Sequence, residues 1–251
     1  MAGHSKWSQI KHAKAITDHR RGKMFTKLAR EVIVAAREGG GDPDANFRLR
    51  MAIQRAKDAN MPNDNIDRAI KRGTGESDDG VQMIEMTYEG YGPGGVAIML
   101  ETLTDNRNRT VSDVRTTLTR AGGNLAESGA VSWQFDKRGV ITVEASEEEA
   151  EEFTLVAIDA GADDFDADSD TLQVFSEPST LEDVRSALES NDATISSSEV
   201  SLIPSNTVPL DNRSAGQILR LLDQLEDLDD VQKVYSNADF PDEALESYQS
   251  A

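Results

Sequence analysis

The chain has 251 residues, with 26 lysines and arginines against 46 aspartates and glutamates, and a formal net charge of -20. Its 37% hydrophobic and 29% charged content predicts a soluble globular protein of two or three domains. No apolar run approaches the ~20 residues of a membrane span. The absence of cysteine excludes disulfides, thiolate metal sites and thiol nucleophiles, and it suits a reducing cytoplasm.

Positive charge is concentrated at the front of this acidic chain. Residues 1–75 hold 16 lysines and arginines against 8 acidic residues, whereas residues 76–251 hold 10 against 38. Residues 3–30 alone contain eight basic residues and one aspartate. Such segregation of charge predicts that the front of the chain meets a polyanion.

The first 75 residues predict a small all-helical domain. Between residues 19 and 37, apolar side chains recur at a spacing of three and four on one helix face: Met24, Phe25, Leu28, Val32 and Ala36. Four basic residues recur with the same period on the opposite side: Arg20, Lys23, Lys27 and Arg30. We expect a second helix at about 45–60 and a third from 63 or 64 to 73, followed by a linker at 73–80.

Beyond residue 80 the apolar period changes to two, which is typical of strands. "QMIEMTYEG" and "VAIMLE" predict two strands, and a helix follows with Val111, Val114 and Leu118 in register. "AVSWQFD" is expected to place Val131 and Phe135 with Trp133 on one strand face. Residues 212–228 predict an amphipathic helix, "VQKVYS" predicts a last strand, and the acidic end is expected to fray.

A pseudo-repeat lies between these parts. Residues 140–165 and 171–195 each predict strand, helix and strand, and each helix is expected to open with a capping box, Ser146 with Glu149 and Ser179 with Glu182. Two such halves predict a βαββαβ ferredoxin-like unit. The pieces on either side look incomplete alone, so we expect them to form one domain into which this unit is inserted. The expected fold class is α+β and multidomain, with a small N-terminal helical domain and two α/β domains.

The basic stripe has two explanations. Most charge runs are solvated helix faces, but this face carries one sign only and is preceded by further cations and rings. Cations that bind a phosphate backbone release its condensed counterions, which increases affinity, and rings can stack on exposed bases. The pattern therefore favours nucleic-acid binding. Adsorption to an anionic membrane is a less favoured hypothesis, because the apolar face of the same helix is needed to pack against the other two helices. The candidate contacts are His4, Lys6, Trp7, Lys11, His12, Lys14, Arg20, Lys23, Lys27 and Arg30.

Arg107 and Arg109 form a second candidate, because they lie where a predicted strand passes into a helix N-terminus. Backbone N–H groups and the helix dipole there favour an anion. Equally, the asparagine and arginine side chains of "TDNRNRT" could cap the helix and pair with local carboxylates. Both alternatives stay open at this point.

No catalytic or metal site is predicted. The three histidines are spaced by eight and seven, which matches no zinc motif, and no clustered ligand set accompanies them. There is no G-x-S-x-G, no Ser/His/Asp order and no cysteine nucleophile. We therefore expect a protein that is not an enzyme, with no cofactor and no small-molecule substrate.

Several segments closely resemble the YebC family: "MAGHSKWSQIKHAKA", "RGKMFTKLAREVIVAAREGGGDP", "ANMPNDNIDRAIKRGTGE", "YEGYGPGGVAIMLETLTDNRNRT" and "GGNLAESGAVSWQFDKRGVI". Its bacterial members are called probable transcriptional regulatory proteins, and its mitochondrial relatives are translational activators of cytochrome oxidase subunit one. The resemblance implies three domains, the last inserted in the second, and a cytoplasmic nucleic-acid-associated factor. It also implies nucleic-acid contact at residues 3–7, 11–14 and 20–23, which adds Arg21 to the candidates.

These observations lead to a non-enzymatic, nucleic-acid-binding regulator of gene expression, a DNA-binding transcriptional regulator by family assignment. The alternative is a ribosome-associated translation factor that binds ribosomal or transfer RNA and eases elongation through stretches such as polyproline. We expect a cytoplasmic monomer that binds no membrane. The expected domains are residues 1–75, residues 81–136 with 204–238, the inserted residues 137–203, and an acidic tail at 239–251.

Overall fold

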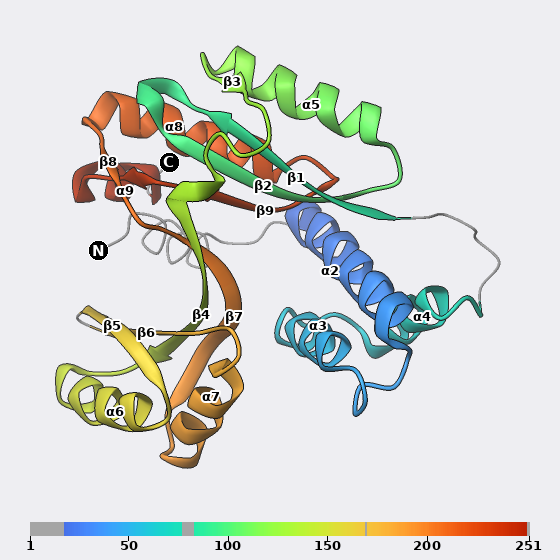
Figure 1. The fold of residues 1–251 in the computed structure, drawn as a ribbon, viewed down its shortest axis with the longest axis vertical. Coiled ribbons are helices and arrows are strands. Elements are labelled where there is room, and N and C mark those ends of the chain that lie inside the picture. The colour runs from blue at the N-terminus through green and yellow to red at the C-terminus, as the bar shows by residue number, and fades with distance from the viewer. Residues whose placement is uncertain (1–17, 77–82, 169, 250–251) are drawn as a thin grey trace.

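The computed structural model describes residues 18–76, 83–168 and 170–249, which form a helical part and two sheets with helices (Figure 1). The helical part contains three helices: α2 (Asp18–Gly39), α3 (Phe47–Asp58) and α4 (Asn63–Gly73). Val32 and Ala36 of α2 are buried against Leu49 and Ala52 of α3 and Ala69 of α4. The predicted all-helical arrangement is therefore present, with helix ends displaced by one or two residues.

Asn46 fixes the turn between α2 and α3. Its Oδ1 accepts a hydrogen bond from Leu49 N at 3.1 Å and so caps α3. Its Nδ2 donates to the carbonyl oxygens of Ala35 at 2.7 Å and Gly40 at 2.8 Å, at the end of α2. One buried side chain thus satisfies backbone groups of both helices.

The first sheet has the order β3-β1-β2-β9. Its strands are β1 (Ile84–Tyr91), β2 (Ala97–Thr104), β3 (Asn124–Leu125) and β9 (Val231–Ser236). The chain leaves this sheet after β3, builds the second sheet, and returns as β9, which pairs antiparallel with β2. Residues more than 120 positions apart therefore share a strand pair.

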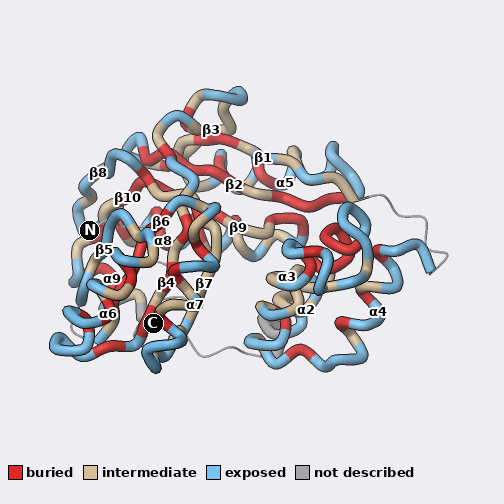
Figure 2. Tube along the Cα trace, turned by 60° about the horizontal axis from the view of Figure 1, so that its bottom comes forward, coloured by how far each residue is buried: buried red, intermediate tan, exposed pale blue. Residues whose placement is uncertain are grey.

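The run of apolar residues in β2 is explained by cover on both faces of the first sheet. On one face, Ile98 and Leu100 join a core with helices α5 (Arg107–Arg120) and α8 (Asn212–Glu226). On the other face, Met99 packs in a separate cluster with Val131 and Tyr235. Figure 2 shows buried positions running along these strands.

The second sheet has the order β5-β6-β4-β7, with every neighbouring pair antiparallel. Its elements follow in chain order as β4 (Phe135–Glu144), α6 (Glu147–Asp159), β5 (Ala162–Asp168), β6 (Thr171–Ser176), α7 (Leu181–Ser190) and β7 (Thr194–Pro204). Both helices cover one face, where Ile141 and Leu172 are fully buried beneath Phe153 and Leu188. The strand–helix–strand repeat expected from the sequence is present in this order.

Only the first of the two predicted capping boxes forms. Ser146 and Glu149 make reciprocal hydrogen bonds at the start of α6. The second prediction is wrong, because α7 begins after Thr180 and not after Ser179, and the Thr180 hydroxyl donates to the carbonyl of Glu177 instead. A one-residue shift of the helix start is enough to remove Ser179 from the capping position.

Two further predictions are wrong. A 3-10 turn, Ser132–Gln134, interrupts the expected strand, so Trp133 is 70% exposed while Val131 and Phe135 are buried. The end of the chain is not frayed over residues 242–249, which form helix α9 (Asp242–Gln249). Its Ala244 and Leu245 are buried in the core beside α8, and this burial stabilises the helix. Short parallel strands, β8 (Val208–Pro209) and β10 (Ala238–Asp239), lie before α8 and α9.

Candidate nucleic-acid interface

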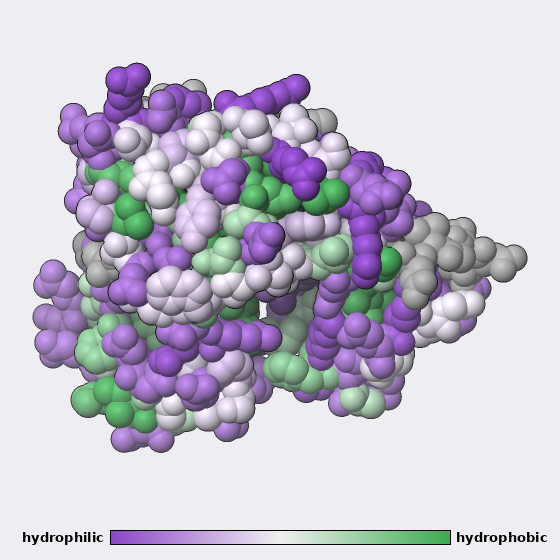
Figure 3. Space-filling view, turned by 45° about the horizontal axis from the view of Figure 1, so that its top comes forward, coloured by the Kyte–Doolittle hydropathy of each residue, from purple (hydrophilic) through white to green (hydrophobic). Residues whose placement is uncertain are grey.

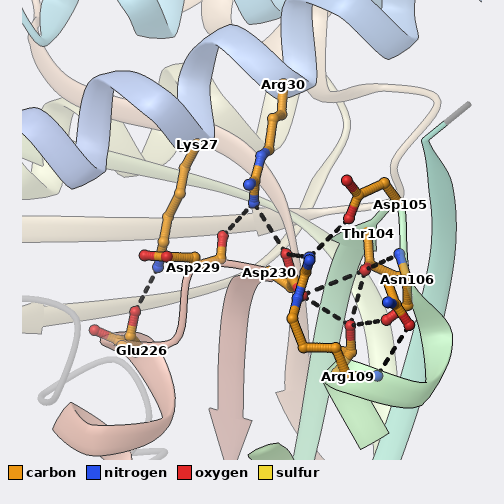
Figure 4. Close-up of polar contacts among 10 residues, drawn as sticks. Lys27, Arg30, Thr104, Asp105, Asn106, Arg109, Glu226, Asp229 and Asp230 are labelled. Atoms are coloured by element: carbon orange, nitrogen blue, oxygen red, sulfur yellow. Dashed lines mark hydrogen bonds and ion pairs between the residues drawn. The ribbon is translucent and has the colours of Figure 1, made fainter. Parts of the chain in front are cut away.

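The basic stripe of α2 faces the turn between α8 and β9 (Figure 4). Lys23 Nζ donates to the carbonyl oxygen of Asp227 at 3.0 Å and lies 3.8 Å from its carboxylate. Lys27 Nζ donates to the carbonyl oxygen of Glu226. Arg30 Nη1 donates to the carbonyl oxygen of Asp229 in the same turn. All three cations are half-buried and lie against one acidic turn, residues 226–230.

This acidic turn attracts cations for two reasons. The last carbonyl groups of α8 have no helical N–H partners, and the helix dipole places partial negative charge at the same end. Four of the five residues from 226 to 230 are also acidic. Lysine and arginine side chains are the groups that stabilise such a helix end. Part of the positive charge of α2 is therefore balanced within the molecule.

Asp230 is the centre of a buried polar network and is only 5% exposed. Its Oδ2 accepts hydrogen bonds from Arg109 Nε at 3.1 Å and from the Thr110 hydroxyl at 2.9 Å. Its Oδ1 accepts from Arg109 Nη2 at 2.9 Å and from Arg30 Nη1 at 3.4 Å. Asp230 thus links the basic helix, the start of α5 and the first sheet.

At the start of α5, Asn106 caps the helix and Arg109 pairs with nearby carboxylates, as the second of the two alternatives expected. Asn106 Oδ1 accepts from Arg109 N at 3.1 Å and caps the helix. The Arg109 guanidinium pairs with Asp230 and, at 2.7 Å, with Asp105. The hydrogen bond from Arg109 lowers the pKa of Asp105, and the bonds to both carboxylates raise the pKa of Arg109. Arg107 is exposed at the same helix start, and nucleic-acid contact there stays a prediction.

The other predicted contacts are not part of what the structure describes. The upstream candidates His4, Lys6, Trp7, Lys11, His12 and Lys14 lie outside the described residues, as do the side chains of Arg20 and Arg21. The structure does bring together Lys23, Lys27 and Arg30 on one side of α2, as their spacing predicts, because all three bind residues 226–230. Contact of these residues with nucleic acid stays a prediction.

Sequence reasoning missed the partner of the stripe. The acidic turn lies about 200 positions from α2 along the chain, for example 204 between Lys23 and Asp227. Its composition alone does not distinguish it from the many other acidic segments of the chain. The folded chain brings this turn beside the basic helix, where Lys23, Lys27 and Arg30 bind it.

A second buried carboxylate organises the loop before β4. Glu89 is 5% exposed and accepts hydrogen bonds from the backbone N–H groups of Gly129 at 2.7 Å, Val131 at 2.7 Å and Ser132 at 3.0 Å. Burial opposes ionisation, but these donors hold the pKa of Glu89 below its ordinary value. The ionised side chain of Glu89 therefore holds the backbone of residues 129–132 in place.

The described residues contain neither a metal-ligand cluster nor a membrane-spanning helix. Over residues 18–76, 83–168 and 170–249, no three histidine or acidic side chains are grouped so that they could hold a metal ion. Within the same ranges, no helix is both long and apolar enough to cross a membrane.

Comparison with known proteins places these features in a family. Residues 5–76 match the model of the TACO1/YebC protein N-terminal domain, and residues 83–238 match that of the TACO1/YebC second and third domain. The chain belongs to the TACO1/YebC family. The two matches meet near the linker predicted at 73–80, and together they include α2, the start of α5 and the acidic turn.

Relatives in this family are similar over nearly their whole length. A protein from Natranaerobius thermophilus, named probable transcriptional regulatory protein, is 53% identical over 98% of this chain and 100% of its own. One from Dehalococcoides mccartyi with the same kind of name is 54% identical over 100% of this chain and 99% of its own. The crystal structure of a conserved hypothetical protein from Aquifex aeolicus has a TM-score of 0.81 at 47% identity, covering 89% of this chain and 92% of that one. The chain thus shares its family with proteins named as probable transcriptional regulators and its fold with the Aquifex aeolicus protein.

Proposed function

We propose that this protein is a non-enzymatic regulator of gene expression that binds nucleic acid through its N-terminal helical domain. The observation that carries the proposal is the single-signed basic stripe on α2 in a chain of net charge -20. The names of the relatives, probable transcriptional regulatory protein, support a regulator that acts on DNA. In this proposal residues 1–75 are the binding domain. The parts at 81–136 with 204–238, the ferredoxin-like insertion at 137–203 and the tail at 239–251 form an acidic body.

Binding at α2 exchanges one set of oxygen atoms for another. Lys23, Lys27 and Arg30 already bind carbonyl and carboxylate oxygens of the acidic turn. Phosphate oxygens offer the same cations stronger charge and release condensed counterions when bound. Nucleic acid therefore competes with the acidic turn for the same face of α2, and the carboxylates elsewhere repel it from the acidic body.

A ribosomal or transfer RNA target is the second candidate. The apolar face of α2 is committed to α3 and α4, and its basic face lies against the acidic turn, so α2 is not presented as a free helix for a major groove. RNA recognition through backbone, shape and stacking needs no such helix. On this observation the translation-factor alternative, with the ribosome as partner, deserves a direct test beside DNA.

The test compares binding of the full chain to a DNA duplex and to an RNA hairpin of equal length, at low and moderate salt. Lys23→Ala with Lys27→Ala should weaken binding about tenfold or more and reduce the salt slope by about 2, since each lysine neutralises about one phosphate. The matched control is Lys57→Ala with Lys71→Ala, which removes the same charge from exposed positions of α3 and α4. Equal losses in the two variants would show that net charge, and not the stripe, governs binding.

Competition by the acidic turn is tested separately. Asp229→Lys places a cation beside Arg30 and should loosen the turn from α2, so the affinity for nucleic acid should rise. Asp67→Lys adds the same charge at an exposed position of α4, away from the turn. If both variants gain affinity equally, the turn does not compete, while the stripe can still be the binding surface.

A further inference from the structure

Exposed hydrophobic side chains gather on one side of the second sheet. Among the described residues, five large hydrophobic side chains are exposed, and three of them lie on α6 and the adjoining strand β5. Leu155 is 67% exposed, Ile158 48% and Phe165 49%. Single exposed apolar residues are common on protein surfaces, whereas neighbouring ones mark interaction sites.

The other two exposed residues lie singly and have local contacts. The guanidinium carbon of Arg50 lies over the ring of Phe47, 5.5 Å from its centroid. The indole Nε1 of Trp133 donates to the carbonyl oxygen of Ala130 at 3.1 Å. Neither residue forms part of a larger apolar surface on α6 and β5.

The three residues lie on two adjoining elements, the helix α6 and the edge strand β5. Leu155 and Ile158 are three positions apart on α6 and therefore neighbours on its surface, while Phe153 of the same helix is buried in the core. Phe165 pairs with Val174, whose side chain lies in the core beneath the helices, so Phe165 lies on the sheet face that α6 covers. Because β5 is an edge strand, Phe165 lies at the margin of that face. Figure 3 shows hydrophobic surface at the lower left, where α6 and β5 lie.

The charge around this surface has one sign. Residues 137–203 contain 18 acidic residues against three lysines and arginines. Neither α6 nor β5 contains a lysine or arginine, and together they hold ten carboxylates: Glu147, Glu148, Glu149, Glu151, Glu152, Asp159, Asp163, Asp164, Asp166 and Asp168. Asp163 is paired with Arg138, and Glu149 accepts hydrogen bonds from Ser146. The apolar residues are thus set among carboxylates.

We infer that the α6–β5 surface binds a basic protein segment, with apolar anchors on Leu155, Ile158 and Phe165 and cations among the surrounding carboxylates. A nucleic acid is disfavoured because its phosphates meet like charge here. A second copy of the same surface is disfavoured because two faces of the same sign repel each other. A basic segment matches both the charge and the apolar centre. This surface is separate from α2 and goes beyond the proposed binding of nucleic acid.

The test uses synthetic helical peptides of about 18 residues, or five helical turns, as probes of the full chain. A leucine and lysine amphipathic peptide should bind, whereas a leucine and glutamate peptide and a serine and lysine peptide should not. Leu155→Ser with Ile158→Ser should weaken binding of the first peptide about tenfold, because the anchors lose their apolar partners. Phe47→Ser, which removes an apolar side chain about as exposed as Ile158 but on α3, should leave the affinity for this peptide unchanged.

Three results would overturn the inference. Equal affinity of the double variant and the unchanged chain would show that the apolar residues do not form the site. Equal binding of the serine and lysine peptide would show attraction by charge alone. Sedimentation showing self-association of the unchanged chain, lost in the double variant, would make a second copy the occupant. Circular dichroism of both variants confirms that each still folds.

Discussion

Replacement of Asp230 by asparagine tests the polar network that joins α2, α5 and the acidic turn. Asp230 is 5% exposed, and its carboxylate accepts hydrogen bonds from the guanidinium groups of Arg109 and Arg30 and from the hydroxyl groups of Thr104 and Thr110. Asparagine keeps the size of the side chain and one acceptor oxygen. It removes the charge, however, and turns an N–H group toward donors that need an acceptor.

The expected loss follows from these contacts. A hydrogen bond to a charged group contributes about 1.5–3 kcal/mol, against about 1 kcal/mol for a neutral pair. The side chain of Arg109 is 46% exposed, so its ion pair belongs at the low end of that range. The bond from Thr110 can persist with the amide oxygen. We expect Asp230→Asn to lower the free energy of unfolding by about 2–3 kcal/mol.

Urea denaturation followed by circular dichroism at neutral pH measures this change. The control is Asp229→Asn, which makes the same change of charge at the exposed neighbouring position. Arg30 contacts Asp229 through its backbone carbonyl, which the substitution retains, so the control should change stability by less than about 0.5 kcal/mol. Equal stability of the two variants would refute the reasoning that Asp230 organises the network.

Three further changes probe other parts of the fold. Glu89→Gln should lower the free energy of unfolding by about 2 kcal/mol at pH 7. Because the pKa of Glu89 in the folded protein lies below the ordinary 4.5, this loss should shrink as pH falls below about 4.5. The exposed control is Glu127→Gln, and a gap in stability between the two variants that does not change with pH would contradict the prediction. Asn46→Ala should cost about 2 kcal/mol in thermal unfolding of the helical part, and a loss below about 0.5 kcal/mol would mean that its three hydrogen bonds are dispensable. Gly73→Ala should cost about 1–3 kcal/mol, since a Cβ there would lie 2.5 Å from Ile33 O; unchanged denaturant midpoints would exclude this clash.

Much of the local structure was predictable from short-range pattern. The apolar period of α2, the caps of α6 and the alternation of β1 depend on residues within one or two turns, and the structure confirms them. Predictions failed where a single residue decides the geometry. Thr180 and not Ser179 precedes α7, and the N–H groups of Val131 and Ser132 bind Glu89 while Trp133 turns outward.

The order of amino acids alone was enough to predict the separation of charge, the spacing of Lys23, Lys27 and Arg30 on one helix side, and the family. What those cations face depends on how the whole chain folds. Folding brings the acidic turn to α2 across about 200 residues and Asp230 to Arg109 across 121. Helical spacing is set by local backbone geometry, which a short segment contains. A contact between distant segments depends on how whole sheets and helices bury their apolar faces, and no short segment contains that information.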